Sequence, residues 1–435
     1  VATHTTGAYA RLREQFNTPI ANFEGIQEVM ARIAGEAYTV DAARRLTLLA
    51  IDRGEKPAVV SSIMKYHATE RMRAVTNDAM DVHSGKGAID GPRNYLSSGY
   101  RAIPIAITVE GANIMTRNLM IYGQGSIRCH PFILDEMAAA QNEDKLEGLK
   151  AFDETLFKHA TFQFKTIART IARSWTLSLF SSSPVSGPTA KYYKRAKQLS
   201  AALTLASEAA MVILGGRLKR MEMLSARLGD VLSELYLLSA VLKKWEDDGR
   251  PEKDLPLVEW SAQTCLHRGE TALKGVLDNF PIRPVAWVLR LMARPFGNRY
   301  GAPRDRLSRK VSDLIATPGD ARDRLIEGIF IGEPDSERGR LEHGLVMSEE
   351  LAPVRQKMRK AKVRDIEKAL SENVITEDEA ERLHEFSALV REVVKVDDFA
   401  LEELTGKPKP RARRKTPAKA SAAAKKKPAS AKASA

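Results

Sequence analysis

Cysteine is nearly absent from this sequence, since Cys129 and Cys265 are the only two among 435 residues. They share no metal-ligand spacing with each other or with the eight histidines, so the sequence predicts no metal site and no disulfide framework. Uncharged apolar runs of about 18 residues are missing as well. The nearest candidate, residues 201–216, carries Glu208. Without a signal-peptide pattern, these absences favour a cytoplasmic protein.

Acidic residues are missing from the end of the chain. Eleven Lys and Arg lie between Lys407 and Lys432, and they supply most of the net charge of +13. The rest of the chain has a net charge of only +2. It therefore lacks the broad basic face of a nucleic-acid-binding domain, and we expect no specific nucleic-acid partner. The Lys/Ala/Pro-rich segment 406–435 has too little apolar surface to fold and is predicted to be a disordered tail.

Alternating strand patterns and internal repeats are also absent. Segments rich in Ala, Leu, Met, Glu, Lys and Arg favour helix throughout, so the predicted fold class is all-α. The first helices are predicted at residues 7–15, 26–52, 57–83 and 112–122. We divide the chain into a helical domain (1–145), a helical C-terminal extension (146–405) and the tail (406–435). Because Val1 opens in the middle of a polar stretch that runs into a helix, we expect the chain to be a fragment.

The extension contains a long apolar stripe. Between Leu218 and Trp245, apolar residues recur every three or four positions, which predicts a long helix packed lengthwise on a neighbour. Thr376 followed by Glu379 is a capping box that predicts the start of a late helix.

Residues 284–296 form a short basic amphipathic segment with two open interpretations. Val285, Val288, Leu289 and Met292 are predicted to share one face, and Trp287 lies near the other with three arginines. The favoured interpretation is a helix packed on the bundle with arginines reaching to solvent. The alternative is peripheral contact with the anionic inner membrane, made together with the basic tail.

Taken singly, the polar residues of the first domain are uninformative. Glu110 beside Gly111 could simply begin a helix, where the dipole favours a carboxylate. Gly85 could mark a plain helix stop, and Arg13 with Gln15 could be a solvated face. Histidines such as His67, His83 and His130 lie near no recognisable nucleophile motif and are interpreted as structural or surface residues.

Three motifs in order change this interpretation. YARLREQF at residues 9–16 is followed by Pro19-Ile20, the turn SGKG lies at 84–87, and VEGA lies at 109–112. Together they resemble the Arg-x-Gln-Phe-x-x-Pro-Ile element, the Gly-Gly-x-Gly turn and the Tyr-Glu-Gly-Thr motif of acyl-CoA dehydrogenases. Residues 105–131 and 225–244 are further similar to the large bacterial fatty-acyl-CoA dehydrogenases of β-oxidation. The resemblance covers nearly all of the chain before the tail.

The resemblance implies a reaction. An acyl-CoA dehydrogenase removes the α-proton of a medium- or long-chain fatty acyl-CoA with a glutamate, passes the β-hydride to FAD and releases a trans-2-enoyl-CoA. Here the catalytic base would be Glu110, whose own backbone N–H also binds the enolate oxygen, and Gly111 would leave room for the substrate. The electrons would then pass to an electron-transfer flavoprotein.

The resemblance also implies the cofactor contacts. Arg13, Gln15 and Phe16 would contact FAD, often across a subunit interface of a homo-oligomer, and the backbone at Gly85 would approach it. Some positions depart from the family: Asp81 replaces a Gln, Ser84 replaces a Gly, and Ala112 replaces a Thr. These departures put individual FAD contacts in doubt but leave the base in place.

Two further expectations complete the interpretation. The family's N-terminal helical and middle β-domains have no counterpart in this sequence, so the chain alone is expected to bind FAD weakly and to lack turnover. The competing class is a non-catalytic helical interaction module whose basic tail binds a polyanion or a membrane.

Overall fold

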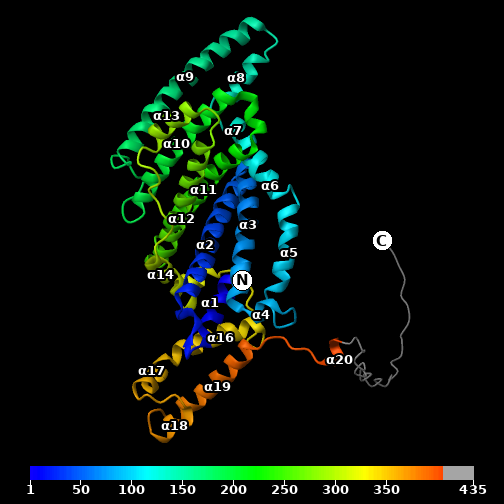
Figure 1. The fold of residues 1–435 in the computed structure, drawn as a ribbon, viewed down its shortest axis with the longest axis vertical. Helices are drawn as coiled ribbons and strands as arrows, with labels where there is room; N and C mark the ends of the chain where they lie inside the picture. Colours follow the sequence, from blue (N-terminus) through cyan, green and yellow to red (C-terminus); the bar gives the residue numbers. More distant parts are fainter. Residues whose placement is uncertain (405–435) are drawn as a thin grey trace, which may run out of the picture. The chain divides into compact units, whose positions relative to one another are not determined.

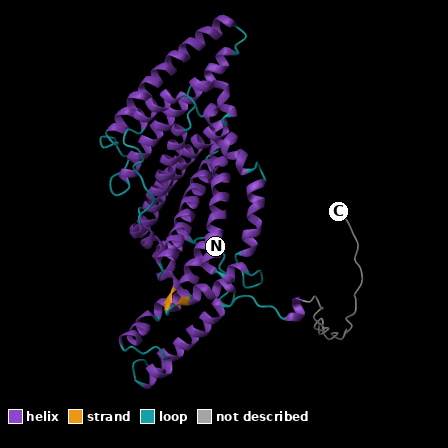
Figure 2. Ribbon diagram, viewed as in Figure 1, coloured by secondary structure: helices purple, strands orange, loops and turns teal. Residues whose placement is uncertain are grey.

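The computed structural model describes residues 1–404, whose regular secondary structure is helix apart from one small hairpin (Figure 2). The predicted all-α fold class is therefore confirmed, and the predicted disordered tail at 406–435 lies outside the described residues. Residues 1–396 form one compact unit. The short helix α20 (Leu401–Leu404) belongs to a second unit that begins at Asp397.

The chain begins with a helix and a small hairpin. Helix α1 spans Ala2–Leu12, strands β1 (Glu14–Gln15) and β2 (Thr18–Pro19) pair antiparallel, and the 3₁₀ turn η1 (Ile20–Asn22) follows. The predicted helix through Gln15 is thus wrong. Phe16 and Asn17 adopt left-handed φ angles of 51° and 62°, which turn the chain back in a two-residue hairpin. This hairpin is the only sheet between residues 1 and 404.

Four long helices run through the middle of the compact unit (Figure 1): α2 (Glu24–Asp52), α3 (Ala58–His83), α11 (Glu222–Asp247) and α12 (Leu255–Asp278). The predicted apolar stripe is confirmed as core, although its helix starts at Glu222, because Leu218 lies in the 3₁₀ segment η3 (Gly215–Arg220). Helices α2 and α12 approach so closely that a Cβ on Gly35 would lie 2.0 Å from the Trp260 ring. Only glycine fits there.

Shorter elements connect α3 to the extension: α4 (Gly85–Ala88), α5 (Ser97–Thr108), α6 (Asn113–Met115), the π-helix η2 (Thr116–Gln124), α7 (Gly125–Arg128) and α8 (Ile133–Ala140). The helix predicted from Ala112 to Tyr122 exists, with Ala112 as its N-cap, but it continues to Arg128 and its centre is a π-helix. No residue pattern predicted this π-helix, a feature that often accompanies functional sites.

The extension is helical as predicted. Its elements are α9 (Lys145–Trp175), α10 (Ala190–Leu214), η4 (Glu252–Asp254), α13 (Arg283–Ala293), α14 (Asp305–Ala316), α15 (Asp320–Leu325), α16 (Glu337–Glu350), α17 (Ala352–Lys360), α18 (Ile366–Ser371) and α19 (Glu377–Val394). The capping box at Thr376 and Glu379 is confirmed. A single hydrophobic core joins α1 and α2 to α11, α12 and α19. The domain boundary at residue 145 remains a prediction.

Helix α10 is the most apolar of the long helices. Together with η3 it is long and apolar enough to cross a membrane by length and composition, but half of its apolar window is buried in the bundle. Glu208, in its middle, binds two histidines. Both observations fit a core helix.

Candidate active site

The predicted catalytic base lies in a sharp turn between α5 and α6. Glu110 and Gly111 both have left-handed φ angles, 55° and 90°. For Gly111 this conformation is ordinary, but for Glu110 it costs about 1–2 kcal/mol. The surrounding contacts must therefore hold the turn in place.

Both polar groups of Glu110 are available. Among the described residues, no donor binds its exposed carboxylate and no acceptor binds its backbone N–H. The turn is flanked by large apolar side chains that face solvent, namely Ile105, Val109, Ile114 and Met115. Several exposed apolar side chains close together in the sequence are typical of a ligand or interdomain contact. The turn thus offers a carboxylate and an N–H donor in apolar surroundings.

The predicted cofactor turn at Gly85 lies at the far end of α3. Ser84 ends the helix with a φ of 52°, and Gly85 is exposed at the start of the single helical turn α4. A Cβ on Gly87 would lie 2.7 Å from the Met80 carbonyl oxygen, so only glycine permits this fold-back. The predicted stop of α3 at Ser84 is confirmed, with the addition of α4, and the contact of Gly85 with FAD stays a prediction.

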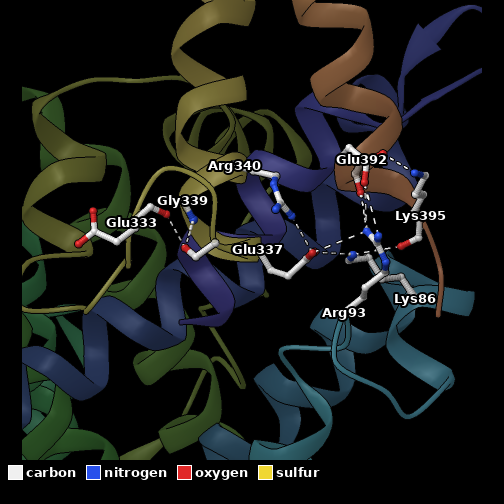
Figure 3. Close-up of polar contacts among 9 residues, drawn as sticks. Lys86, Arg93, Glu333, Glu337, Gly339, Arg340, Glu392 and Lys395 are labelled. Atoms are coloured by element: carbon white, nitrogen blue, oxygen red, sulfur yellow. Dashed lines mark hydrogen bonds and ion pairs between the residues drawn. The ribbon is translucent and has the colours of Figure 1, made fainter. Parts of the chain in front are cut away.

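Helices α16 and α19 contact the segment that follows this turn. Figure 3 shows Lys86 and Arg93 converging on Glu337 of α16 and on the end of α19. The buried Lys86 ammonium lies 3.2 Å from the Glu337 carboxylate and donates to the backbone oxygen of Lys395 at 3.1 Å. Arg93 donates to the Glu392 carboxylate at 3.4 Å. The C-terminal helices therefore fix the segment that follows Gly85.

Arg13, Gln15 and Phe16 lie at the same end of the bundle as Gly85. The Tyr9 ring, one helical turn before Arg13, stacks on the His83 ring with 4.2 Å between centroids. Arg13 makes no ion pair among the described residues, Gln15 is exposed, and the Phe16 ring is 89% exposed. The hairpin thus presents the Phe16 ring and the Gln15 side chain to solvent, next to the half-buried Arg13.

The predicted site residues form two groups. Glu110 and Gly111 lie near Lys65 in the first part of α3, whereas Gly85 follows the last residue of that helix. At 1.5 Å per residue, about 27 Å separates Lys65 from His83. A single chain therefore does not bring Glu110 and the hairpin residues together.

A buried charge network, which the sequence analysis missed, lies between the central helices. It consists of Glu36, Arg71, Glu234 and Arg268. Arg71 donates to Glu234 at 2.9 Å and to Glu36, and Arg268 donates to Glu36 at 2.6 Å. Burial opposes ionisation of Glu36, but Arg71 and Arg268 outweigh it and lower the pKa of that carboxyl. Burial raises the pKa of Glu234. The only sequence signal was a charged residue within the small apolar run IAGEA.

A second cluster also escaped the sequence analysis. The Glu208 carboxylate binds Nε2 of His130 at 2.7 Å and Nε2 of His159 at 3.1 Å. All three ligand-type atoms lie within 4.8 Å of one another, close enough to hold a metal ion.

The hydrogen bonds of this cluster favour protons over a metal. His130 Nδ1 accepts the backbone N–H groups of Phe132 and Ile133, so its proton lies on Nε2 and points at Glu208. A metal would need that same Nε2 lone pair. Burial opposes charging of His159, but hydrogen bonds to Glu136 and Glu208 outweigh it and raise its pKa. We interpret the cluster as a set of structural hydrogen bonds that links the α7–α8 loop to α9 and α10.

Comparison with known proteins gives the family. Residues 1–124 match the model of the acyl-CoA dehydrogenase C-terminal domain, and residues 127–399 match that of the bacterial-type acyl-CoA dehydrogenase C-terminal region. An acyl-CoA dehydrogenase of Bacillus anthracis, solved in complex with FAD, has a similar fold, with a TM-score of 0.55 and 17% identity over 72% of this chain and 52% of that one.

The curated relatives are matched over a shorter stretch. A 3-(aryl)acrylate reductase of Clostridium sporogenes is 34% identical over 108 residues, which is 24% of this chain and 27% of that protein. An acryloyl-CoA reductase (NADH) of Anaerotignum propionicum is 34% identical over 106 residues, 24% of this chain and 26% of that protein. This chain thus spans about a quarter of the length of these relatives. Because one family model covers more than half of the chain and a second covers most of the remainder, the chain belongs to the acyl-CoA dehydrogenase family.

Proposed function

We propose that this chain carries the catalytic base of an FAD-dependent dehydrogenase that converts medium- or long-chain fatty acyl-CoA to trans-2-enoyl-CoA, the first step of fatty-acid β-oxidation. The observation that supports it is Glu110, which lies in a left-handed turn and whose carboxylate and backbone N–H have no partner among residues 1–404. One residue can thus take the α-proton and donate to the thioester oxygen.

The chemistry requires both groups. A thioester α-proton is too weakly acidic for a carboxylate in water, so the negative charge that develops on the carbonyl oxygen must be stabilised by a preorganised donor. The Glu110 N–H is such a donor. Apolar neighbours such as Val109 and Ile114 exclude water once the site is covered, which strengthens the base. Gly111 leaves the approach to the carboxylate open.

FAD is the proposed cofactor, and when bound it supplies the acceptor for the β-hydride. Arg13 and Phe16 fit such a group, because a guanidinium binds phosphate oxygens in pairs and an exposed aromatic ring can pack on a planar heterocycle. Gln15 and the backbone at Gly85 would add polar contacts. Since these residues lie about 27 Å along α3 from the Glu110 turn, we propose that they serve the flavin of a second subunit in a homo-oligomer.

The direction of the reaction is the first point to test. The curated relatives are named as reductases of an arylacrylate and of acryloyl-CoA. We expect saturated medium- and long-chain acyl-CoA to bleach the flavin of the full-length, FAD-loaded protein anaerobically and to yield the trans-2-enoyl-CoA, with electrons then passing to an electron-transfer flavoprotein. Bleaching by NADH together with consumption of acryloyl-CoA, and no response to saturated acyl-CoA, would contradict the proposal.

Peripheral membrane contact is a second proposal, and it rests on α13. That helix packs on the bundle through Ala286, Leu289 and Ala293, whereas Val288, predicted on the packed face, lies on the exposed side, 49% exposed. It joins an exposed apolar surface, the α13 patch, made of Trp175, Trp287, Val288, Leu291 and Phe296. Exposed arginines at 283 and 290 flank it. An apolar patch beside cations suits an anionic lipid surface.

Liposome co-sedimentation tests the α13 patch. Replacing Trp287 and Leu291 together by Ser should reduce binding to anionic liposomes at least about 10-fold, since each side chain would bury apolar surface worth about 1.5–3 kcal/mol. The matched control is Phe157→Ser, which removes an equally exposed ring from α9. Equal binding by the double variant and the control would rule the patch out as a lipid contact.

A further inference from the structure

The turn that carries Glu110 is tied to the bundle by one lysine of α3. The Lys65 ammonium donates to the Ile107 carbonyl at 3.1 Å, to the Gly111 carbonyl at 2.6 Å and to the Asn113 side-chain oxygen at 2.6 Å. An ammonium has three N–H donors, and all three are used. The acceptors come from the last turn of α5, from the turn itself and from the first residue of α6.

A second side chain reinforces the same attachment. Asn113 is buried, and its amide nitrogen donates to the Thr69 hydroxyl and to the Glu70 carboxylate of α3, both at 2.8 Å. The Thr116 hydroxyl adds a bond to the Gly111 carbonyl at 3.2 Å. The backbone before and after Glu110 is therefore hydrogen-bonded to α3. The Glu110 side chain itself makes no contact with a polar group of the described residues.

We propose that Lys65 is a positioning residue for the α-proton abstraction: it fixes the left-handed backbone at Glu110 and thereby aims both the carboxylate and the N–H at the substrate. The inference rests on the proposed role of Glu110. Lys65 acts here through the backbone, because its three donors are used by oxygens of α5, the turn and α6.

The expected effect of Lys65 on the rate comes from the geometry of the Glu110 backbone. Two consecutive left-handed residues form a tight turn, and Glu110 does not favour this conformation without outside support. When the three bonds are lost, the turn can relax by rotating about the Glu110 backbone, which moves the carboxylate away from the reacting carbon. A displacement of about 1 Å can reduce a rate about 100-fold. Substrate binding, which depends on other surfaces, should change little.

The test is Lys65→Met in the full-length, FAD-loaded protein, with Lys56→Met as the control, since Lys56 is exposed just before α3. The rate of flavin reduction at saturating acyl-CoA should fall between about 10-fold and 100-fold. KM and FAD content should stay within about 2-fold, and amide hydrogen exchange should accelerate at residues 109–116 alone. An unchanged rate, or a rate loss that only follows loss of FAD or of global stability, would overturn the proposal.

Two further variants distinguish failure of the Lys65 proposal from failure of the proposed function. If Lys65→Met does not fold, Lys65→Arg tests the proposal, because arginine keeps the charge and the donors on a side chain of different length. We expect a several-fold loss of rate at unchanged KM. A wild-type rate in Lys65→Arg would overturn the proposal. Glu110→Gln is measured in parallel. An inactive Glu110→Gln beside a fully active Lys65→Met rejects the role of Lys65 alone, whereas an active Glu110→Gln rejects the proposed function itself.

Discussion

Glu110→Gln should lower the rate of flavin reduction by acyl-CoA by between about 10²-fold and 10⁴-fold, the usual contribution of a general base. The substitution keeps the size of the side chain and the backbone N–H but replaces the carboxylate by an amide, which is far too weak a base to accept the α-proton. Because the Glu110 carboxylate has no partner among the described residues, its loss should leave folding intact. The measurement is anaerobic stopped-flow bleaching of the flavin at saturating acyl-CoA.

The matched control for this experiment is Glu55→Gln. Glu55 is also exposed and follows the end of α2. Its replacement should change neither the rate nor the FAD content. FAD content in Glu110→Gln should equal that of the wild type, because the residues proposed to hold the cofactor lie at the other end of α3. Retained flavin reduction in Glu110→Gln would remove this residue from the mechanism.

Arg71→Met should lower the free energy of unfolding by about 3–5 kcal/mol. Arg71 is buried and lies between two buried carboxylates, Glu36 and Glu234, and methionine fills similar space without the charge. Both carboxylates would lose this counterion, leaving only Arg268 on Glu36. Urea denaturation followed by circular dichroism measures the change. The control is Arg73→Met, whose exposed pair with Glu70 should contribute less than about 1 kcal/mol.

The loss of unfolding free energy in Arg71→Met should depend on pH in a defined direction. The pKa of Glu36 is lowered in the folded protein, so its stabilising contribution is present above its usual pKa and is lost as the pH falls through the folded value. In Arg71→Met the remaining carboxylates can be buried only at a cost while ionised, and protonation relieves that cost. The stability difference between wild type and Arg71→Met should therefore narrow as the pH falls from 7 to about 4. A constant difference would show that lost packing, not charge, is responsible.

The sequence by itself determined the helical class, the approximate bounds of several long helices and the order of the motifs. Local signals suffice for these features: the residue pattern of α3 and its stop at Ser84, the capping box at Thr376, and the spacing of the stripe in α11 depend on neighbours within a few turns. The wrong boundary at Gln15 is instructive. Helix-favouring residues continue past Leu12, but two left-handed residues at 16 and 17 pair β1 with β2 instead.

Only the tertiary structure decided how the site is supported. The bonds from Lys65 to the Glu110 turn, the contacts of Lys86 with α16 and α19, and the charge network of Glu36, Arg71 and Glu234 all join residues distant in sequence. No periodic pattern encodes such pairs, because their partners are set by how helices cross. The structure also decided that α13 keeps an apolar face in solvent. Motif order in the sequence singled out Glu110 as the proposed base, and only the structure showed that Lys65 of α3 binds the turn that carries it.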